Sequence, residues 1–268
     1  MRRIAFDRQL KPATNMVQCL EAISVRKASA RTETNANPSL IAQLDIEALN
    51  EMFKLASPQE ILAWCVANIP EGLVQTTSFS VLAITHILYK ELAHPVPVIF
   101  LDTLHLFQET LDTAGKANFI YDLNLHTYRA VGANTREAFA KRYGNKLWER
   151  DIDQFYAITK VEPLKRALSD LNVKAWITGR RRDQSETRSA LPIFERDDDG
   201  RLKINPLANW TKQELWAYVD ANNVIYNPLY DQGYTSIGDE PLTTPTADGE
   251  SERAGRWRGS EKTECGIH

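Results

Sequence analysis

The spacing of the hydrophobic residues changes along the chain from a helical period to short apolar runs. Between residues 40 and 55, hydrophobic side chains recur every three or four positions, which predicts an amphipathic helix. The tetrapeptide SPQE at residues 57–60 has the form of a capping box with proline at the first helical position, and predicts a second helix over residues 58–68. Cys65 lies on the apolar side of this helix, which favours a core position over a chemical role.

From residue 73 onward, apolar strands alternate with helical patterns. The predicted strands cover residues 73–77, 96–102, 125–130 and 174–179, and the predicted helices between them cover about 81–92, 106–118 and 153–171. This alternation indicates an α/β fold with a mostly parallel sheet flanked by helices. Ligands of such sheets bind beyond the carboxyl ends of the strands, so the residues that follow each strand are the candidates for chemistry.

Two further patterns extend this domain. Residues 192–207 predict a two-stranded excursion that turns at Asp199-Gly200, and a second capping box at residues 211–214 begins an amphipathic helix that ends near residue 223. From residue 224 the chain is rich in Gly, Pro, Tyr, Ser and Thr, which predicts irregular structure. Glycines at 255, 259 and 266 would let the last segment fold over a ligand.

The composition narrows the class of protein. The chain has 268 residues, 43% of them hydrophobic, and a net charge of -3, which argues against a general nucleic-acid binder. The sequence has no apolar run of transmembrane length, so no membrane span is expected. Its three cysteines are widely spaced, without metal-ligand or disulfide spacing, which is typical of a reducing compartment and favours a cytoplasmic location.

The first 38 residues differ in composition from the rest. They are basic and rich in Ser, Thr and Asn, and we expect a poorly ordered basic extension, with a transit peptide or an over-extended gene start as alternatives. The predicted domain therefore covers residues 39–268, and residues 252–268 form its tail.

Hydroxyl side chains follow the first predicted strand. Thr76, Thr77, Ser78 and Ser80 occupy a strand-to-helix turn, where hydroxyls and backbone N–H groups can hold an anion; ordinary helix capping is the alternative. The second strand is followed by Asp102, Thr103 and His105. A lone histidine in such a loop is more often structural, and Asp102 could cap the next helix.

Arginines follow the strand that ends at residue 179. Gly179 is succeeded by Arg180, Arg181, Arg182 and Arg188, which surround Gln184 and Ser185, and guanidinium groups in this number suit phosphate or sulfate. A solvated face neutralised by Asp183 and Glu186 is the alternative, but the position at the ligand edge of the sheet favours anion binding.

The last residues combine cations, an aromatic ring and a thiol. ERAGRWRGSEKTECGIH interleaves Arg253, Arg256 and Arg258 with Trp257 before Cys265. An exposed free thiol is a chemical liability, so its place here calls for a function.

In their order along the chain, these motifs closely resemble the assimilatory 3'-phosphoadenylylsulfate (PAPS) reductases, especially the fungal branch, over about residues 57–268. The motifs are QTTSF, FLDTLHLF, AITKVEP, TGRRRDQSETRS, INPLANWT, YNPLYDQGYTSIGD, ERAGRWRG and KTECGIH. The resemblance implies an adenine-nucleotide α-hydrolase-like fold with PAPS across the strand ends and its phosphosulfate near residues 76–80. It places Lys160, Arg188, Arg253 and Arg256 around the phosphosulfate. Ser80 departs from the family, which commonly has glycine there, so the loop is expected to be less open.

The resemblance also implies a mechanism and partners. Cys265 would attack the sulfuryl sulfur to form S-sulfocysteine, and reduced thioredoxin or glutaredoxin would then release sulfite for cysteine biosynthesis. It suggests a homodimer with a mobile catalytic tail. His268 could assist the thiolate electrostatically, although fraying of the chain end is the simpler expectation.

The cysteine count bears on the substrate. Adenosine 5'-phosphosulfate (APS) reductases of this fold hold a 4Fe-4S cluster on four cysteines, whereas this sequence has three, and has Ala157, Ile158, Asp239 and Leu242 at the corresponding positions. We therefore expect no bound cofactor and PAPS as substrate, with Arg180, Arg181 and Arg182 as candidates for its 3'-phosphate.

Alternative functions remain open at this point. They are an APS reductase without a cluster, a nucleotide-binding redox regulator, and an ATP pyrophosphatase or adenylyltransferase that needs Mg²⁺. The last would require a fuller Ser-Gly-Gly-x-Asp-Ser loop than QTTSFS provides.

Overall fold

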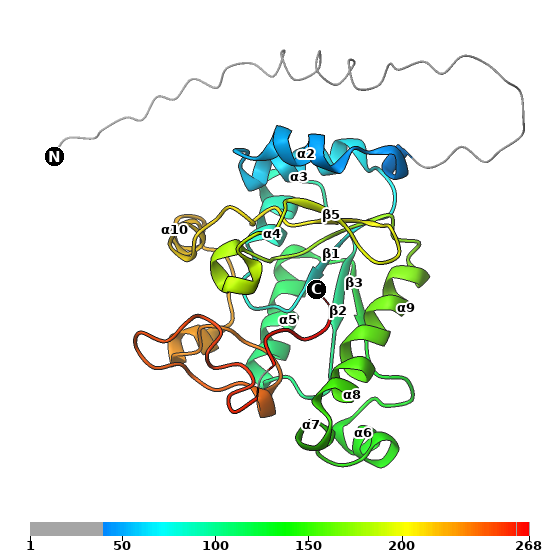
Figure 1. Cartoon of the computed structure of the whole chain (residues 1–268), viewed down its shortest axis with the longest axis vertical. Coiled ribbons are helices and arrows are strands. Elements are labelled where there is room, and N and C mark those ends of the chain that lie inside the picture. Colours follow the sequence, from blue (N-terminus) through cyan, green and yellow to red (C-terminus); the bar gives the residue numbers. More distant parts are fainter. Residues whose placement is uncertain (1–39, 261, 268) are drawn as a thin grey trace, which may run out of the picture. The chain divides into compact units, whose positions relative to one another are not determined.

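The computed structural model describes residues 40–260 and 262–267. These residues form an α/β domain around one six-stranded sheet, with helices on both of its faces (Figure 1). The predicted basic extension over residues 1–38 and the side chain of His268 lie outside the described residues. No helix in the described part of the chain is long and apolar enough to cross a membrane.

The helix expected between residues 40 and 55 is divided in two, whereas the second predicted helix is found as expected. A 3-10 turn, Leu40–Gln43, precedes α2 (Ile46–Phe53), because Asp45 accepts a hydrogen bond from the Ala48 amide and restarts the helix. The predicted boundaries of α3 (Pro58–Asn68) are confirmed, and both hydrogen bonds of its capping box are present. Cys65 is fully buried in the core, and burial raises the pKa of its thiol far above the ordinary value.

The sheet has the strand order β3-β2-β1-β4-β6-β5. Its strands are β1 (Leu73–Thr77), β2 (Val98–Leu101), β3 (Leu125–Tyr128), β4 (Ala175–Ile177), β5 (Phe194–Arg196) and β6 (Leu202–Ile204). All neighbours are parallel except β5 and β6, which form the predicted hairpin. The hairpin is not a separate excursion, because β6 also pairs in parallel with β4 and extends the main sheet.

Alternating side chains of each strand feed two cores on opposite faces of the sheet. In β1, Leu73 packs with the larger core beneath α3, α4 (Ala83–His86), α5 (Gln108–Tyr121) and α10 (Lys212–Asn222). The next residue, Val74, packs with Leu164 and Leu168 of α9 (Glu162–Asp170). This alternation is the two-residue period of a strand that is buried on both sides.

Two helices contain π-helical turns. The predicted helix over 153–171 consists of α8 (Ile152–Tyr156), a π-helical turn at Ala157–Val161 and α9, and Ile87–Glu91 similarly extends α4. Such turns are frequent at functional sites, and the turn at Ala157–Val161 carries Lys160. The short helices α6 (Arg136–Tyr143) and α7 (Leu147–Arg150) were not predicted.

The segment after α10 is irregular, as predicted, but it is packed against the domain. Its described helical parts are the 3-10 turns Pro228–Gln232 and Glu240–Leu242. Isolated bridges join Tyr226 to Val81 and Asp239 to Leu106, so the segment is attached to the loops that follow β1 and β2. In Figure 1 its red end reaches the region of β1 and β2.

Candidate active site

A cavity of about 250 Å³ lies at the carboxyl ends of β1 and β4. The chain order reverses there, because β2 and β3 lie on one side of β1 while β4 and β6 lie on the other, and ligands of open α/β sheets bind at such a point. The cavity brings together most of the predicted site residues: Thr76, Thr77, Ser78, Ser80, Thr103, Lys160, Gly179, Arg180, Arg181, Gln184, Arg188, Arg253, Arg256, Trp257 and Cys265.

The hydroxyl-bearing residues at the end of β1 and in the turn after it line the cavity. Phe79 has a left-handed backbone (φ 52°), its ring is buried edge-on against Phe100, and its amide donates to the Thr77 hydroxyl at 3.1 Å. The Ser78 and Ser80 hydroxyls are 3.0 Å apart. No side chain caps α4, which starts only at Ala83, so the capping alternative for this turn is not what the structure shows.

Two predicted residues after β2 do not line the cavity. Asp102 accepts from Arg129 Nε at 2.7 Å and from the Leu104 amide at 2.9 Å. His105 is buried among aromatic rings, with Phe139, Trp148 and Phe155 edge-on at 4.9–5.2 Å between ring centroids. Burial lowers the pKa of His105 and so favours its neutral form. Thr103, which lies between Asp102 and Leu104 in the chain, does line the cavity.

Two predicted residues of the arginine loop also lie away from the cavity wall. Arg182 donates to the Leu191 carbonyl at 2.7 Å and to Asn209. The Ser185 and Thr187 hydroxyls are 2.9 Å apart. The contacts of Arg182 and Ser185 therefore lie within the protein and fix the shape of the loop, while Arg181 and Gln184 line the cavity.

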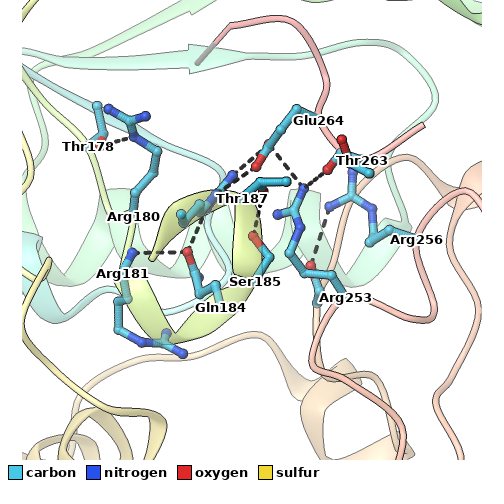
Figure 2. A network of polar contacts seen from close by, with 12 residues as sticks. Thr178, Arg180, Arg181, Gln184, Ser185, Thr187, Arg253, Arg256, Thr263 and Glu264 are labelled. Atoms are coloured by element: carbon cyan, nitrogen blue, oxygen red, sulfur yellow. Dashed lines mark hydrogen bonds and ion pairs between the residues drawn. The ribbon is translucent and has the colours of Figure 1, made fainter. Parts of the chain in front are cut away.

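Carboxylates hold the other arginines of this loop. Arg180 donates to Glu195 and, at 3.2 Å, to Asn205, while Arg181 contacts Asp183 at 2.9 Å and Glu252 at 2.7 Å. Figure 2 shows Arg180 and Arg181 extending in opposite directions from this loop. Glu252 lines the cavity, and its pKa is raised because burial outweighs the attraction of Arg181.

Arg188 and Arg253 converge on one carboxylate, that of Glu264 (Figure 2). Arg188 makes two parallel hydrogen bonds to it, both 2.7 Å long, and Arg253 adds a third at 3.1 Å. Burial disfavours the carboxylate, but the hydrogen bonds and charges of Arg188 and Arg253 prevail, so the pKa of Glu264 is lowered.

Lys160, which lines the cavity, forms a buried ion pair with Asp239. Its Nζ atom lies 2.7 Å from Asp239 Oδ2 and 4.6 Å from the centre of the Tyr156 ring, and Thr103 donates to Asp239 Oδ1 at 2.6 Å. Burial acts against the ammonium, but Asp239, Tyr156 and the Cys265 thiol favour it, and the pKa of Lys160 lies above the ordinary value.

Trp257 packs against the guanidinium group of Arg256. Its Nε1 donates to the Tyr156 hydroxyl at 2.6 Å, and the guanidinium of Arg256 lies 4.5 Å from the centre of the Trp257 rings. Arg256 Nη1 donates to the Ile237 carbonyl at 3.2 Å, whereas its buried Nε has no partner in the described residues. Gly238 permits this arrangement, because a Cβ there would collide with the guanidinium.

Cys265 is half-buried at the same cavity. It packs beside the cluster that contains Phe155, Tyr156 and Trp257. Burial and Arg188 lower the pKa of Arg253 to about 10, while Glu264 and the Cys265 thiol act in the opposite direction. The thiol of Cys265 therefore shares the cavity with the cationic side chains of Lys160 and Arg253.

Sequence reasoning missed the acidic side chains of the site. Asp239, Glu252 and Glu264 all belong to motifs that were singled out, yet a carboxylate in an anion-binding sequence gives no local signal of its role. Among the described residues, no three His, Cys, Asp or Glu side chains are grouped so that they could hold a metal ion.

Comparisons with known proteins first define the fold class. The fold resembles that of Candida glabrata FMN adenylyltransferase in complex with FAD and inorganic pyrophosphate, with a TM-score of 0.54 at 16% identity over 84% of this chain and 83% of the other. At this identity the likeness shows the fold alone, which is the adenine-nucleotide α-hydrolase-like class that the sequence predicted.

A nearer set of relatives defines the family. The profile of the phosphoadenosine phosphosulfate reductase domain matches residues 73–245. The phosphoadenosine phosphosulfate reductases of Emericella nidulans and Saccharomyces cerevisiae are 48% and 43% identical, over 83% and 87% of this chain and 74% and 92% of theirs. The crystal structure of phosphoadenylyl-sulfate (PAPS) reductase from Candida auris, a phosphate complex, has a TM-score of 0.69 at 42% identity and covers 74% of this chain and 96% of its own. The chain belongs to the phosphoadenosine phosphosulfate reductase family.

Proposed function

We propose that this protein reduces PAPS to sulfite and adenosine 3',5'-bisphosphate in sulfate assimilation, with Cys265 as the nucleophile. Family membership supports the reaction. The observation that carries the proposal is the place of Cys265, which lies in the cavity at the strand ends together with Lys160, Arg253 and Arg256.

The first step transfers the sulfuryl group to the thiolate. The Cys265 thiolate attacks the sulfur, a new S–S bond forms, and the bond from sulfur to the phosphate oxygen breaks with its electron pair on the departing phosphate. Both reactants are anionic, so cations must neutralise their repulsion and the charge of the leaving group. Lys160, Arg253 and Arg256 are placed to supply this charge.

The second step restores the thiol. A thiolate of reduced thioredoxin or glutaredoxin attacks Cys265 Sγ, and sulfite departs with the electron pair of the S–S bond. The second thiol of the donor then breaks the mixed disulfide, which regenerates Cys265 and leaves the donor oxidised. A protein donor cannot reach a thiol inside the cavity, so the segment that carries Cys265 must move outward between the two steps.

The remaining assignments follow from the same site. The turn at residues 76–80 receives the phosphosulfate, Arg180 and Arg181 are the candidates for the 3'-phosphate, and no cluster takes part because the sequence has three cysteines. A homodimer and a cytoplasmic location stay predictions. Residues 252–268, as the catalytic tail, are part of this proposal.

Two other functions predict different behaviour. A nucleotide-binding redox regulator would bind the nucleotide without turnover. An adenylyltransferase, which the fold also accommodates, would release pyrophosphate from ATP in the presence of Mg²⁺.

The variant Cys265→Ser tests the proposed chemistry. We expect sulfite release with PAPS and reduced thioredoxin to fall to background, while the Kd for adenosine 3',5'-bisphosphate changes less than about threefold. The matched control is Cys65→Ala, which removes a buried thiol that does not line the cavity and is expected to lower stability but to retain turnover. Substantial sulfite release by Cys265→Ser would refute the mechanism.

A further inference from the structure

The carboxylate of Glu264 occupies cations that the family mechanism assigns to the substrate. Arg188 is 8% exposed at its side chain, and its donors are engaged by protein: Nε and Nη2 by Glu264, Nη1 by Gln184. Arg253 is engaged by Glu264 and by the Thr263 carbonyl at 2.9 Å. While these contacts persist, each of the three guanidinium nitrogens of Arg188 donates one N–H group to protein.

The same contacts fix the residue that precedes the nucleophile. Glu264 is adjacent to Cys265, and its carboxylate holds two arginines that come from separate parts of the chain, one after β4 and one after α10. Figure 2 shows Glu264 and Thr263 above the guanidinium group of Arg253. The chain before and after makes weaker attachments: Lys262 pairs with Asp153, whose side chain is 81% exposed, and Ile267 packs at the edge of the α9 core.

Two other cationic side chains that line the cavity, Lys160 and Arg256, are not held by Glu264. Lys160 is paired with Asp239, and Arg256 keeps a buried Nε without a partner among the described residues. The cationic groups therefore divide into two sets. Arg188 and Arg253 hold the tail through Glu264, whereas Lys160 and Arg256 have other partners.

We propose that Glu264 is a positioning residue: its pairing with Arg188 and Arg253 seats Cys265 against Lys160 for the first step, and its release opens the tail for the thiol donor. The inference rests on the proposed function for the meaning of the first step, but the seating itself is a property of the free protein. Two charge-assisted bonds in parallel fix orientation as well as distance, which a single contact from a flexible tail cannot do.

The test of seating needs no activity. In Glu264→Gln we expect iodoacetamide to alkylate Cys265 roughly tenfold faster than in the unaltered protein, because the tail loses its charged hydrogen bonds. The rate is taken from the high-pH plateau, where it no longer depends on the thiolate fraction, and is measured on the peptide that contains Cys265. Glu250→Gln is the matched control, since Glu250 pairs with Arg258 on the same segment and does not line the cavity.

The kinetic test separates positioning from substrate competition. Without any thiol donor, formation of adenosine 3',5'-bisphosphate in a single turnover should slow at least tenfold in Glu264→Gln, and Glu264→Asp should recover part of the loss. Release of sulfite from enzyme already loaded with S-sulfocysteine should not slow, and the Kd for adenosine 3',5'-bisphosphate should change less than threefold.

Three outcomes would overturn the inference. Unchanged alkylation in Glu264→Gln would show that Glu264 does not seat the tail. A tenfold tighter Kd for the bisphosphate would show that its carboxylate competes with a substrate phosphate instead. Equal slowing of both steps would indicate a general structural role. Absence of any bisphosphate from the unaltered protein would instead refute the proposed function and leave the alkylation result standing.

Discussion

Lys160 and Asp239 form an ion pair at 2.7 Å in which the aspartate is fully buried and the lysine side chain is 11% exposed. Lys160 belongs to the π-helical turn before α9, and Asp239 belongs to the irregular segment after α10. The pair therefore joins two parts of the chain that are remote in sequence.

Removal of this carboxylate should destabilise the fold. In Asp239→Asn the Lys160 ammonium keeps its place without a counter-charge, and we expect the free energy of unfolding to fall by about 3 kcal/mol. Urea denaturation at pH 7 measures the change, with Asp231→Asn as control because Asp231 is exposed. A loss below about 1 kcal/mol, within the usual range for an exposed pair, would contradict this account of the buried pair.

The same carboxylate should contribute to acid sensitivity. Burial opposes its charge, but Lys160 and Thr103 outweigh burial, so the pKa of Asp239 lies below the ordinary value. Its contribution to stability is therefore complete above about pH 4, the pKa in the unfolded chain, and is lost as pH falls through the lower folded value. The stability difference between the unaltered protein and Asp239→Asn should shrink below pH 4.

Lys203 should make the stability rise with pH in a mildly alkaline window. Its pKa is lowered to about 8 by burial and then by Arg180, whereas an unfolded lysine titrates near 10.4. Between these values the unfolded chain binds more protons, so this group favours folding increasingly as pH rises. In Lys203→Met the rise in the free energy of unfolding should be absent. In Lys116→Met, which replaces an exposed lysine and serves as control, the rise should persist. Denaturation of each variant at pH 7 and at pH 9.5 measures the difference. Equal slopes in the two variants would exclude Lys203 as the source.

Gly255 should be intolerant of a side chain. A Cβ there would collide with the Thr244 carbonyl, which belongs to the turn bridged to Arg256. We expect Gly255→Ala to cost about 1–3 kcal/mol and to weaken bisphosphate binding about tenfold, because Arg253 and Arg256 shift together. Gly115→Ala is the control: no atom lies within 4 Å of its added methyl in α5, so a gain of about 0.5–1 kcal/mol is expected. Unimpaired binding in Gly255→Ala would show that the bridge does not set the arginines.

The choice between PAPS and APS is decided by kinetics. The adenosine 5'-phosphosulfate reductase of Lysinibacillus sphaericus is 40% identical to this chain. Overall sequence similarity therefore does not distinguish the two substrates, and the two kcat/KM values have to be compared. We expect kcat/KM to favour PAPS by at least a hundredfold, since a ligand without the 3'-phosphate forgoes the charge-assisted hydrogen bonds that Arg180 or Arg181 would donate to it. In Arg181→Gln this preference should shrink mainly through KM for PAPS. A preference for APS would overturn the substrate assignment.

Local signals predicted the elements whose ends are set by a few neighbouring residues. The capping box at Ser57 and Glu60 located α3 to the residue, and the apolar run LVQTT located β1 in the same way. The helices α6 and α7 were missed because their apolar side chains are few, and their packing depends on Phe139 and Leu147 meeting Phe155 from another helix.

The candidate site was predictable in its parts but not in its directions. Arg181 and Arg182 are adjacent and chemically identical, yet Arg181 lines the cavity while Arg182 donates to the Leu191 carbonyl. His105 follows a strand as a ligand would, yet aromatic rings from α6, α7 and α8 enclose it. Side-chain direction at a loop depends on the backbone of that loop and on distant neighbours, which no local pattern contains.

The sequence by itself determined the alternation of strands and helices, the caps, and the edge of the sheet at which chemistry had to lie. These features depend on residues that are close together along the chain. Only the tertiary structure decided that Asp239 pairs with Lys160 and that Glu264 draws Arg188 and Arg253 to the tail beside Cys265. Arg188 and Glu264 are 76 positions apart in the sequence, and Lys160 and Asp239 are 79 positions apart. These pairs form because a charge that folding buries needs a partner of opposite charge, and only the fold decides which residue is near enough to serve.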